Sequence, residues 1–232
     1  MQIAIMQPYF LPYLGYFQLM AAVDKFVVLD DVNFINKGWI NRNRLLLNGR
    51  AHTFTVPLKG ASQNRRICDI DLVDEPFWRE KLLKTIRQAY AKAPCFDEMF
   101  SLIEHIVNFP ARQLNEFLLN SLREMARTLQ LSVDIVESSR SYGNADLKAQ
   151  ARIIDICKRE GATTYVNAIG GTELYDRQAF AKQGIGLHFL QPYPVDYPQN
   201  SATHVPWLSM LDVLMFNPVQ IVRDLLHQRE LV

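Results

Sequence analysis

Two arginines and two asparagines alternate within four consecutive residues of this chain, in the segment "NRNR". In an extended strand the side chains point alternately to two faces, so Arg42 and Arg44 would share one face. Asn41 and Asn43 would share the other. Guanidinium groups at this spacing can hold a diphosphate through charge-assisted hydrogen bonds, and amides recognise hydroxyl or amide groups. Together with Lys37, the segment predicts a phosphate-binding site; the alternative is a solvated hairpin whose arginines pair with acids.

A pair of acidic residues comes shortly before this segment. Asp30 and Asp31 directly follow the apolar run "FVVL". A carboxylate at the end of a buried strand can act as a general base, and Asp31 is the best candidate for that role in the chain. Asp30 is its candidate partner in ligand binding. The five histidines are scattered; His204 follows a segment rich in proline and tyrosine that could close over a ligand as a lid, but a lone histidine is usually structural.

The segment "QPYFLPYLGYF" combines one amide, two prolines, one glycine and five aromatic residues. A polar amide after a strand, followed by the amino terminus of a helix, suits an anionic or nucleotide-like ligand. The candidate ligand-binding residues of this loop are Gln7, Tyr9, Tyr13, Gly15 and Tyr16. The alternative is a packed turn in which the aromatic side chains belong to the core.

If the loop holds a ligand, its aromatic residues should divide into two sets. Tyr13 and Phe17 are four residues apart on the expected helix, so they should share one face and pack inward. The hydroxyl groups of Tyr9 and Tyr16 should then reach the pocket.

A third candidate cluster lies in "YVNAIGGTELYD". An apolar strand ends at Asn167, and Gly170 and Gly171 would open a helix that runs through Gln183. Backbone N–H groups at such a turn can cradle a phosphate or carboxylate. The same pattern also fits a plain tight turn in which Thr172 caps the helix.

The elements that must position these residues form a strand–helix–strand pattern. Residues 3–6 and 26–29 are short, nearly continuous apolar runs, typical of parallel strands that are covered on both faces. Further strands are expected at 133–136, 164–168 and 186–190, parallel to the first two where they alternate with helices. The sequence therefore predicts an α/β fold with a mostly parallel, Rossmann-like sheet. Such sheets bind ligands at the carboxyl ends of their strands.

Two additions interrupt this pattern. Residues 38–58 are expected to form a β-hairpin around a type I′ turn at Asn48 and Gly49. Residues 75–131 are expected to form a helical insertion that Pro94 and Pro110 divide into about three helices. Residues 68–73 could add a short strand. The prediction is one α/β domain over residues 1–232.

Composition excludes several classes of protein. A net charge of +1 gives no overall attraction to nucleic acid or to anionic membranes. The three cysteines are widely spaced, without ligand spacing, so we expect no structural metal and a reducing compartment. Prolines interrupt the apolar opening, and no later stretch is long enough to insert into a membrane. The expected location is cytoplasmic.

The motifs also carry a resemblance. The segments "QPYFLPYLGYF", "DKFVVLDDVNF", "GWINRNRLL" and "YVNAIGGTELYD" together resemble the WbqC-like family of bacterial proteins. The resemblance implies a role in or near surface-polysaccharide (O-antigen) biosynthesis, with glycine or aminoacyl transfer to an amino sugar among its activities. The match at Gly170 is less distinct than the first three.

A more distant likeness concerns the scaffold. A strand, a proline-rich loop and a glycine in the first helical turn resemble the nucleotidylyltransferases with an HxGH signature. This chain has Tyr13 and Tyr16 where that signature has histidines, so the likeness extends to the fold and not to adenylyl transfer.

The functional expectation is a transferase that uses an activated donor, either a nucleotide-linked sugar or an aminoacyl or acyl group. The donor is a small molecule, with ATP or a nucleotide sugar as the expected nucleotide. A carrier protein or a second copy of the chain stays open as a partner. The alternative is a non-catalytic nucleotide or small-molecule binding protein on a scaffold that has lost its HxGH motif.

Overall fold

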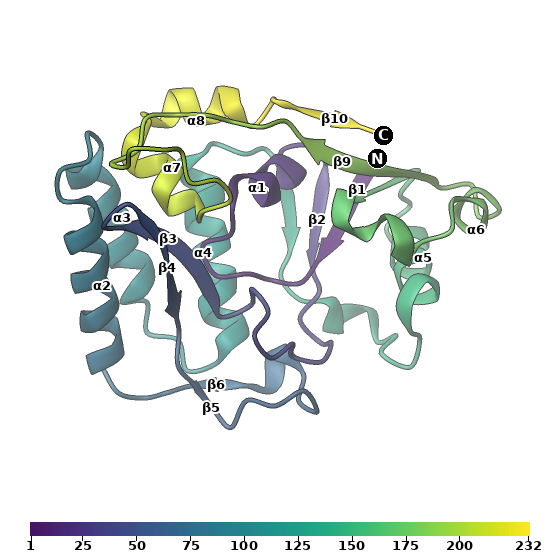
Figure 1. Cartoon of the computed structure of the whole chain (residues 1–232). Helices are drawn as coiled ribbons and strands as arrows, with labels where there is room; N and C mark the ends of the chain where they lie inside the picture. Colours follow the sequence, from purple (N-terminus) through teal and green to yellow (C-terminus); the bar gives the residue numbers. More distant parts are fainter.

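A six-stranded, mostly parallel sheet forms the centre of the computed structural model, which describes residues 1–232 (Figure 1). The strand order is β10-β9-β8-β1-β2-β7. Strands β1, β2, β7, β8 and β9 run parallel, and only β10 is antiparallel to its neighbour β9. The strands are β1 (Gln2–Met6), β2 (Lys25–Val28), β7 (Asp134–Val136), β8 (Thr164–Ala168), β9 (Gly186–Pro192) and β10 (Arg229–Leu231). The predicted α/β class and the parallel strands are confirmed.

The strands are buried on both faces, as their apolar runs indicate. Ile3 and Ile5 point to one face and belong to a cluster of 13 buried residues. Ala4, between them, points to the other face and joins a cluster of 46. Because successive side chains of a strand point to opposite faces, β1 contributes residues to both cores.

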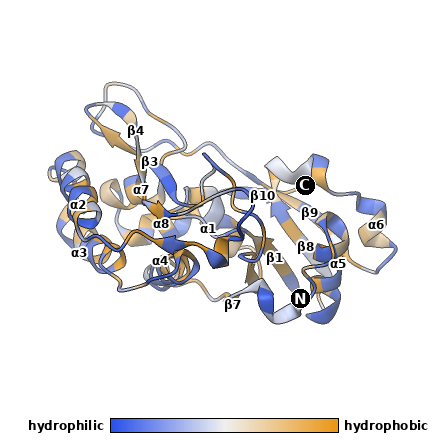
Figure 2. Ribbon diagram, turned by 90° about the horizontal axis from the view of Figure 1, so that it is seen from below, coloured by the Kyte–Doolittle hydropathy of each residue, from blue (hydrophilic) through white to orange (hydrophobic).

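Helices cover the two faces unequally. The smaller core lies under α5 (Ala149–Arg159) and α6 (Arg177–Ala181). The larger core lies under all the remaining helices, and Figure 2 shows apolar residues along the central strands and mixed polarity on the outer helices. These helices are α1 (Leu14–Met20), α2 (Phe77–Tyr90), α3 (Phe96–Val107), α4 (Leu114–Thr128), α7 (Met210–Phe216) and α8 (Val219–Leu225).

The hairpin and the helical insertion pack against the larger core. Strands β3 (Arg42–Leu47) and β4 (Arg50–Thr55) pair antiparallel. Asn48 and Gly49 have φ values of 52° and 71°, as the predicted type I′ turn requires. A second small ribbon pairs β5 (Leu58–Lys59) with β6 (Asp71–Leu72).

Several predicted boundaries were wrong. The helix expected from Gly170 to Gln183 is instead a 3₁₀ turn (Ile169–Leu174) followed by the separate helix α6. Helix α6 begins anew because the Asp176 side chain caps its amino terminus, accepting from the Gln178 N–H at 2.8 Å. The short strand expected at 68–73 is present only at β6 (Asp71–Leu72), because a 3₁₀ turn (Ile67–Asp69) takes up the start of that span. Helix α7 was not predicted.

The cysteines form no disulfide, and Cys68 and Cys157 are buried. Burial raises the pKa of the Cys68 thiol to about 11 and that of Cys157 to about 12. Both therefore stay protonated at neutral pH and serve as small apolar groups. None of the helices reaches the length and apolar character needed to cross a membrane.

Phe17 tests the larger core. Its side chain is fully buried on α1, so Phe17→Ala should lower the free energy of unfolding by about 3–5 kcal/mol through lost contacts and the cavity left behind. Leu174→Ala is the control, because Leu174 is 68% exposed and its loss should change stability by no more than about 0.5 kcal/mol. Urea unfolding measures both. Equal effects would contradict the assignment of Phe17 to the core.

Candidate functional site

The sheet has a switch point beside its first strand. From β1 the chain proceeds to β2 on one side, whereas β8 and β9 lie on the other. The loops that leave β1 and β8 therefore diverge at the carboxyl edge. In open parallel sheets this is where ligands bind.

The loop after β1 is held in an unusual conformation. Leu11 has a φ of 42°, a region that non-glycine residues rarely occupy. Its carbonyl oxygen accepts hydrogen bonds from Asn43 Nδ2 at 2.8 Å and from Ser209 Oγ at 2.6 Å. Phe10 N–H donates to the Ile40 carbonyl at 3.0 Å. The hairpin and the start of α7 thus clamp the loop from two sides.

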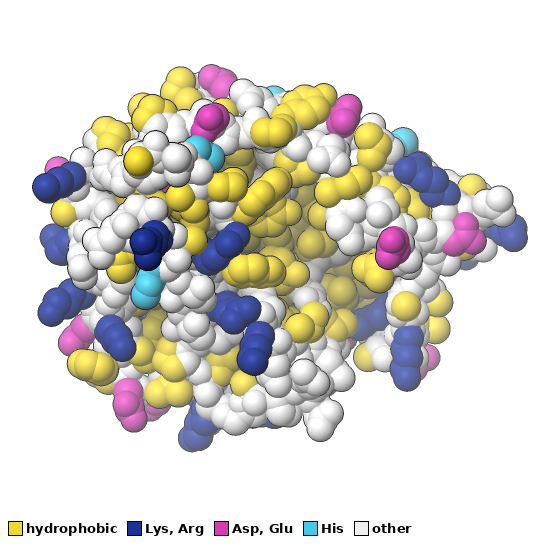
Figure 3. All heavy atoms as spheres, in the orientation of Figure 1, with side chains coloured by type: hydrophobic (Ala, Val, Ile, Leu, Met, Phe, Trp, Pro, Cys, Tyr) yellow, Lys and Arg dark blue, Asp and Glu magenta, His cyan; other side chains and the backbone are white.

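Between the clamped loop and the hairpin lies a pocket of about 160 Å³, here called the arginine pocket. It opens on the face shown in Figure 3, which is hollowed at its middle and carries lysine and arginine side chains over the hairpin on one side. The lining residues are Tyr9, Pro12, Tyr13, Trp39, Asn43, Arg44 and Trp207. Four aromatic rings and one guanidinium group define its chemistry.

Arg44 supplies the positive charge of this pocket. Its Nη2 donates to the Trp207 carbonyl at 3.1 Å, and its Cζ lies 5.5 Å from the centre of the Trp39 ring. Its Nε is buried and has no hydrogen-bond partner. A buried donor without a partner is costly, so an acceptor on a ligand that reached this atom would form a favourable hydrogen bond.

Arg42 lies on the same face of β3, as the alternation predicts. Its Cζ is 5.6 Å from the centre of the Trp39 ring, so both guanidinium groups flank one tryptophan. The Arg42 Nε donates to the Gly38 carbonyl at 2.9 Å, and Nη2 donates to the Lys37 carbonyl. Arg42 is therefore held to its own loop, beside the pocket and not in its lining.

The tyrosine hydroxyls of the pocket are neutral donors. Burial raises the pKa of Tyr9, with a further contribution from Tyr13, and burial also raises the pKa of Tyr13. Neither phenol ionises near neutral pH, so each can donate a hydrogen bond and neither can serve as a base.

The expected division of the aromatic residues is wrong at Tyr16 and incomplete at Tyr13. Tyr16 is only 2% exposed, and its hydroxyl donates to the Gln7 carbonyl at 2.8 Å instead of reaching a pocket. Tyr13 packs against the larger core that contains Phe17, as expected, but it also lines two pockets. The Tyr13 ring lies against Gly15, where a Cβ would overlap it, so the absence of a side chain at Gly15 makes this position possible.

The acidic pair serves the fold. Asp31 is 6% exposed and forms a bidentate ion pair with Arg152 Nη2 at 2.6 and 2.7 Å. Asp30 is fully buried and accepts from Ser138 Oγ at 2.7 Å and Asn115 Nδ2 at 3.3 Å. The Asp31 carboxylate therefore has the geometry of a structural ion pair, and neither acid lines the arginine pocket.

The loop after β8 is built around one side chain. Asn167 is buried, and its Oδ1 accepts from the Ala168 N–H at 2.9 Å. A Cβ on Gly171 would overlap the Asn167 amide, so this glycine is required for packing. Gly170 is exposed and has open space around its Cα. These residues share the sheet edge with the arginine pocket but do not line it.

The other predicted residues lie around the pocket without lining it. The Gln7 side chain is half-buried at the end of β1, and Lys37 is exposed, with a φ of 60°. Asn41 uses its Nδ2 to donate to the Val56 carbonyl at 2.8 Å, inside the hairpin.

The segment between β9 and α7, residues 193–208, covers a second cavity and is anchored by Asp212. This fully buried carboxylate accepts from the hydroxyls of Tyr90 and Tyr197, each at 2.7 Å, and from Gln199 Nε2 at 2.7 Å. His204 is paired on the segment itself, with Nδ1 2.9 Å from Asp196 Oδ1. The segment lies over a cavity, as a lid would, and His204 has a structural partner.

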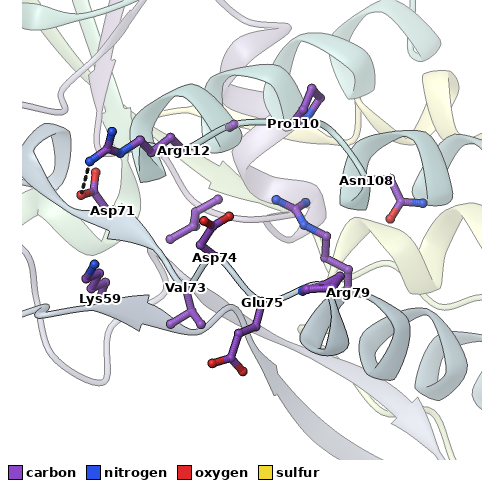
Figure 4. A pocket seen from close by; sticks show the side chains of 12 residues that line it. Lys59, Asp71, Val73, Asp74, Glu75, Arg79, Asn108, Pro110 and Arg112 are labelled. Atoms are coloured by element: carbon purple, nitrogen blue, oxygen red, sulfur yellow. Dashed lines mark ion pairs between the residues drawn. The ribbon is translucent and has the colours of Figure 1, made fainter.

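The largest hollow, of about 660 Å³, lies elsewhere, between the β5–β6 ribbon and the starts of α2 and α4 (Figure 4). Its rim mixes both signs of charge, and Arg112 lies 4.0 Å from Asp71. Glu75 points away from the centre in Figure 4. No residue of the sequence-predicted site lines this hollow. Because its lining carries both acidic and basic side chains, it does not favour a ligand of either charge.

Sequence reasoning named neither tryptophan of the pocket as a ligand-binding residue. Trp39 is 42% exposed and Trp207 is 58% exposed, although both are large apolar residues. Trp39 stands among polar residues and Trp207 follows Pro206, both outside any apolar periodicity, and that position was the available signal. Trp207 also has a φ of 60°, an uncommon conformation that Leu11 and Lys37 share near this site.

Comparison with known proteins gives the family. The model of the WbqC-like protein family matches residues 7–224. The chain belongs to the WbqC-like family. An uncharacterized family relative from Mycobacterium tuberculosis, Rv1507c, is 28% identical over 219 residues, which are 93% of each protein. No solved structure matches the chain.

The buried ion pair yields a stability prediction. Arg152→Met would leave the Asp31 carboxylate buried without its partner, so the free energy of unfolding should fall by about 3–5 kcal/mol. The control is Arg123→Met, which breaks a pair with Glu137 whose side chains are 43% and 62% exposed and should cost at most about 1 kcal/mol. Urea unfolding of both variants measures the two losses of stability. A small loss in Arg152→Met would indicate that the Asp31 carboxylate does not depend on Arg152 and could act in binding or catalysis.

Asp212 yields a pH prediction. Burial raises the pKa of this carboxyl above its ordinary 3.8. The folded protein then binds the proton more readily than the unfolded chain, so ionisation of Asp212 removes stability as the pH rises from 3.8 through the raised value. Asp212→Asn cannot titrate. The stability of the parent relative to this variant should therefore fall with rising pH across that window and level off above it.

Urea unfolding of parent and variant at a series of pH values measures this difference. A difference that grows with pH would mean that the hydrogen bonds to the carboxylate outweigh its burial.

Proposed function

We propose that this protein is a transferase of bacterial surface-polysaccharide biosynthesis that binds an activated, nucleotide-linked sugar or aminoacyl donor in the arginine pocket. Membership of the WbqC-like family supports a biosynthetic enzyme. The observation that carries the proposal is the unpartnered, buried Nε of Arg44 in a pocket with four aromatic rings.

The pocket suits a ligand with a ring and an anionic group. Trp39 and Trp207 offer flat, half-exposed apolar faces on which a base or sugar can stack. A phosphate oxygen would accept from the Arg44 guanidinium in a charge-assisted hydrogen bond. The neutral hydroxyls of Tyr9 and Tyr13 would donate to the remaining oxygens or to ribose. Arg42, beside the same tryptophan, would add positive potential at the pocket mouth.

The position of the pocket also supports this proposal. Tyr9, Pro12 and Tyr13 come from the loop at the carboxyl end of β1, beside the switch point. Gln7, Asn167 and Gly170 lie at the same edge and would contact the part of a donor that extends beyond the pocket. Asp31 is paired with Arg152 and is not free to act as the base. The base would then come from the acceptor substrate or from segment 193–208.

One observation favours a second candidate, a non-catalytic binding protein. Both acids at the carboxyl edge are occupied by structural partners, Asp31 by Arg152 and Asp30 by Ser138. An enzyme needs a titratable group within reach of its substrate, whereas a binding protein does not. Incubation with a bound donor and candidate amino-sugar acceptors separates the two, since only a transferase forms a transfer product detectable by mass spectrometry.

Binding of the donor is tested with arginine variants. Arg44→Ala should weaken binding of a nucleotide sugar or ATP, whichever stabilises the parent in a thermal-shift screen, by about 1.5–3 kcal/mol, or roughly 10- to 150-fold. Arg42→Ala should weaken it less, because Arg42 does not line the pocket. Calorimetric titration measures both.

Arg50→Ala is the matched control, an exposed arginine at the far end of the same hairpin. It should bind as the parent does. A loss at Arg50 equal to that at Arg44 would indicate general charge attraction, and unchanged binding in Arg44→Ala would refute the proposed donor site.

A further inference from the structure

We infer that the protein has a second subsite, the lid cavity, which binds a small, uncharged, apolar group carrying an N–H or O–H donor. The inference goes beyond the donor site and does not depend on it. The cavity measures about 330 Å³, at the small end of the range for small-molecule sites. It lies between the first turns of α1, the end of β9 and the segment 193–208. Its lining residues are Tyr13, Leu14, Gly15, Gln18, Pro192, Tyr193, Pro194, Val195, Tyr197, His204, Pro206, Trp207, Leu208 and Val213.

The lining selects for an uncharged ligand. It contains no lysine, arginine, aspartate or glutamate. The one histidine, His204, is already paired with Asp196. Aliphatic side chains, prolines and aromatic rings make up most of the wall, so a charged group would be desolvated there without a compensating partner.

Gln18 adds a specific polar requirement. This residue is fully buried on α1, and its Nε2 donates to the carbonyls of Leu225 at 2.9 Å and Gln228 at 3.1 Å. Because both partners are acceptors, the amide nitrogen must face them and the orientation of the amide is determined. The Oε1 atom is left with no partner. A buried acceptor without a donor is unfavourable, and a ligand N–H or O–H would satisfy it.

The geometry relates this cavity to the arginine pocket. Tyr13 and Trp207 line both, with ring centres 6.1 Å apart in an edge-to-face arrangement. The two rings form the wall that the pockets share. A group bound in the lid cavity would therefore lie next to a donor substrate bound at Arg44. This is the position required of an acceptor substrate, or of the apolar end of the donor substrate itself.

The roof of the cavity is held from inside the protein. Tyr197 and Gln199 of segment 193–208 both bond to the buried Asp212 carboxylate. Val195 also lines the cavity from this segment, whereas Ala202 of the same segment is exposed and does not line it. This difference provides a matched pair of variants.

Indole and benzofuran test the inference on the full chain. The two molecules have nearly the same shape, but only indole carries an N–H donor. Indole should bind the parent about 5- to 10-fold more tightly than benzofuran, in line with one buried hydrogen bond. Amide-proton NMR titrations should show shifts at Leu14, Gln18 and Val195. Equal affinities, or shifts confined to other surfaces, would overturn the inference.

Variants locate the binding. Gln18→Leu should abolish the preference for indole, and Val195→Trp, which fills the cavity from its exposed segment, should reduce binding of both molecules at least 10-fold. Ala202→Trp should leave binding unchanged. If Gln18→Leu does not fold, Val195→Trp still decides, because parent-like binding in that variant would refute the site.

Trp39→Ala separates this inference from the proposed function. Trp39 lines the arginine pocket and not the lid cavity, so this variant should weaken donor binding and leave indole binding unchanged. Indole binding that falls with donor binding would mean that there is one site and not two.

Discussion

The carbonyl oxygen of Leu11 is the point on which the candidate site depends. It receives hydrogen bonds from Asn43 on the hairpin and from Ser209 before α7, so three distant segments meet at one atom. Leu11 itself has a left-handed backbone conformation that needs such support. Without this contact, the loop after β1 would have no defined position relative to the hairpin, and neither Tyr9 nor Tyr13 would face Arg44.

The same contact explains why two pockets share a wall. Ser209 follows Trp207 closely, and its N–H donates to the Arg44 carbonyl at 2.9 Å. The Arg44 side chain in turn donates to the Trp207 carbonyl. Trp207 is thereby placed against Tyr13, which lies over Gly15 at the start of α1. Hydrogen bonds to backbone carbonyls therefore help to position the aromatic wall between the arginine pocket and the lid cavity.

The acidic residues at the sheet edge have partners inside the protein. Asp31 and Arg152 pair almost completely out of water, and Asp30 is surrounded by hydroxyl and amide donors. These groups join β2 to the 3₁₀ turn after β7 and to α5, so they stabilise the edge of the sheet on which the loops rest. The charge that is left for a ligand comes from the hairpin, which lies beside the sheet and not in it. The aromatic residues of the arginine pocket thus come in part from the loop after β1, whereas its charge comes from the hairpin.

Sequence reasoning predicted the parallel sheet, the hairpin with its turn and the shared face of Arg42 and Arg44. Each of these depends on short-range rules: buried parallel strands are apolar throughout, Asn48 and Gly49 accept positive φ, and alternate residues of a strand point the same way. These rules need no knowledge of distant neighbours. The prediction of a site at the carboxyl edge likewise came from the strand–helix–strand pattern of the first residues.

Roles of single side chains were less predictable, because they depend on which partner folding brings near. Asp31 has the residue type of a base, yet Arg152, 121 residues away, occupies it. Tyr16 has the hydroxyl of a ligand-binding residue, yet that hydroxyl bonds to the Gln7 carbonyl inside the core. Gln18 has no distinguishing feature in the sequence, yet its amide nitrogen donates to the Leu225 carbonyl of α8 and its oxygen has no partner. The sequence by itself determined the parallel strands and the hairpin, since these arise from local patterns. Only the tertiary structure decided which polar groups stay free there, because a hydrogen bond between distant residues has no local signature.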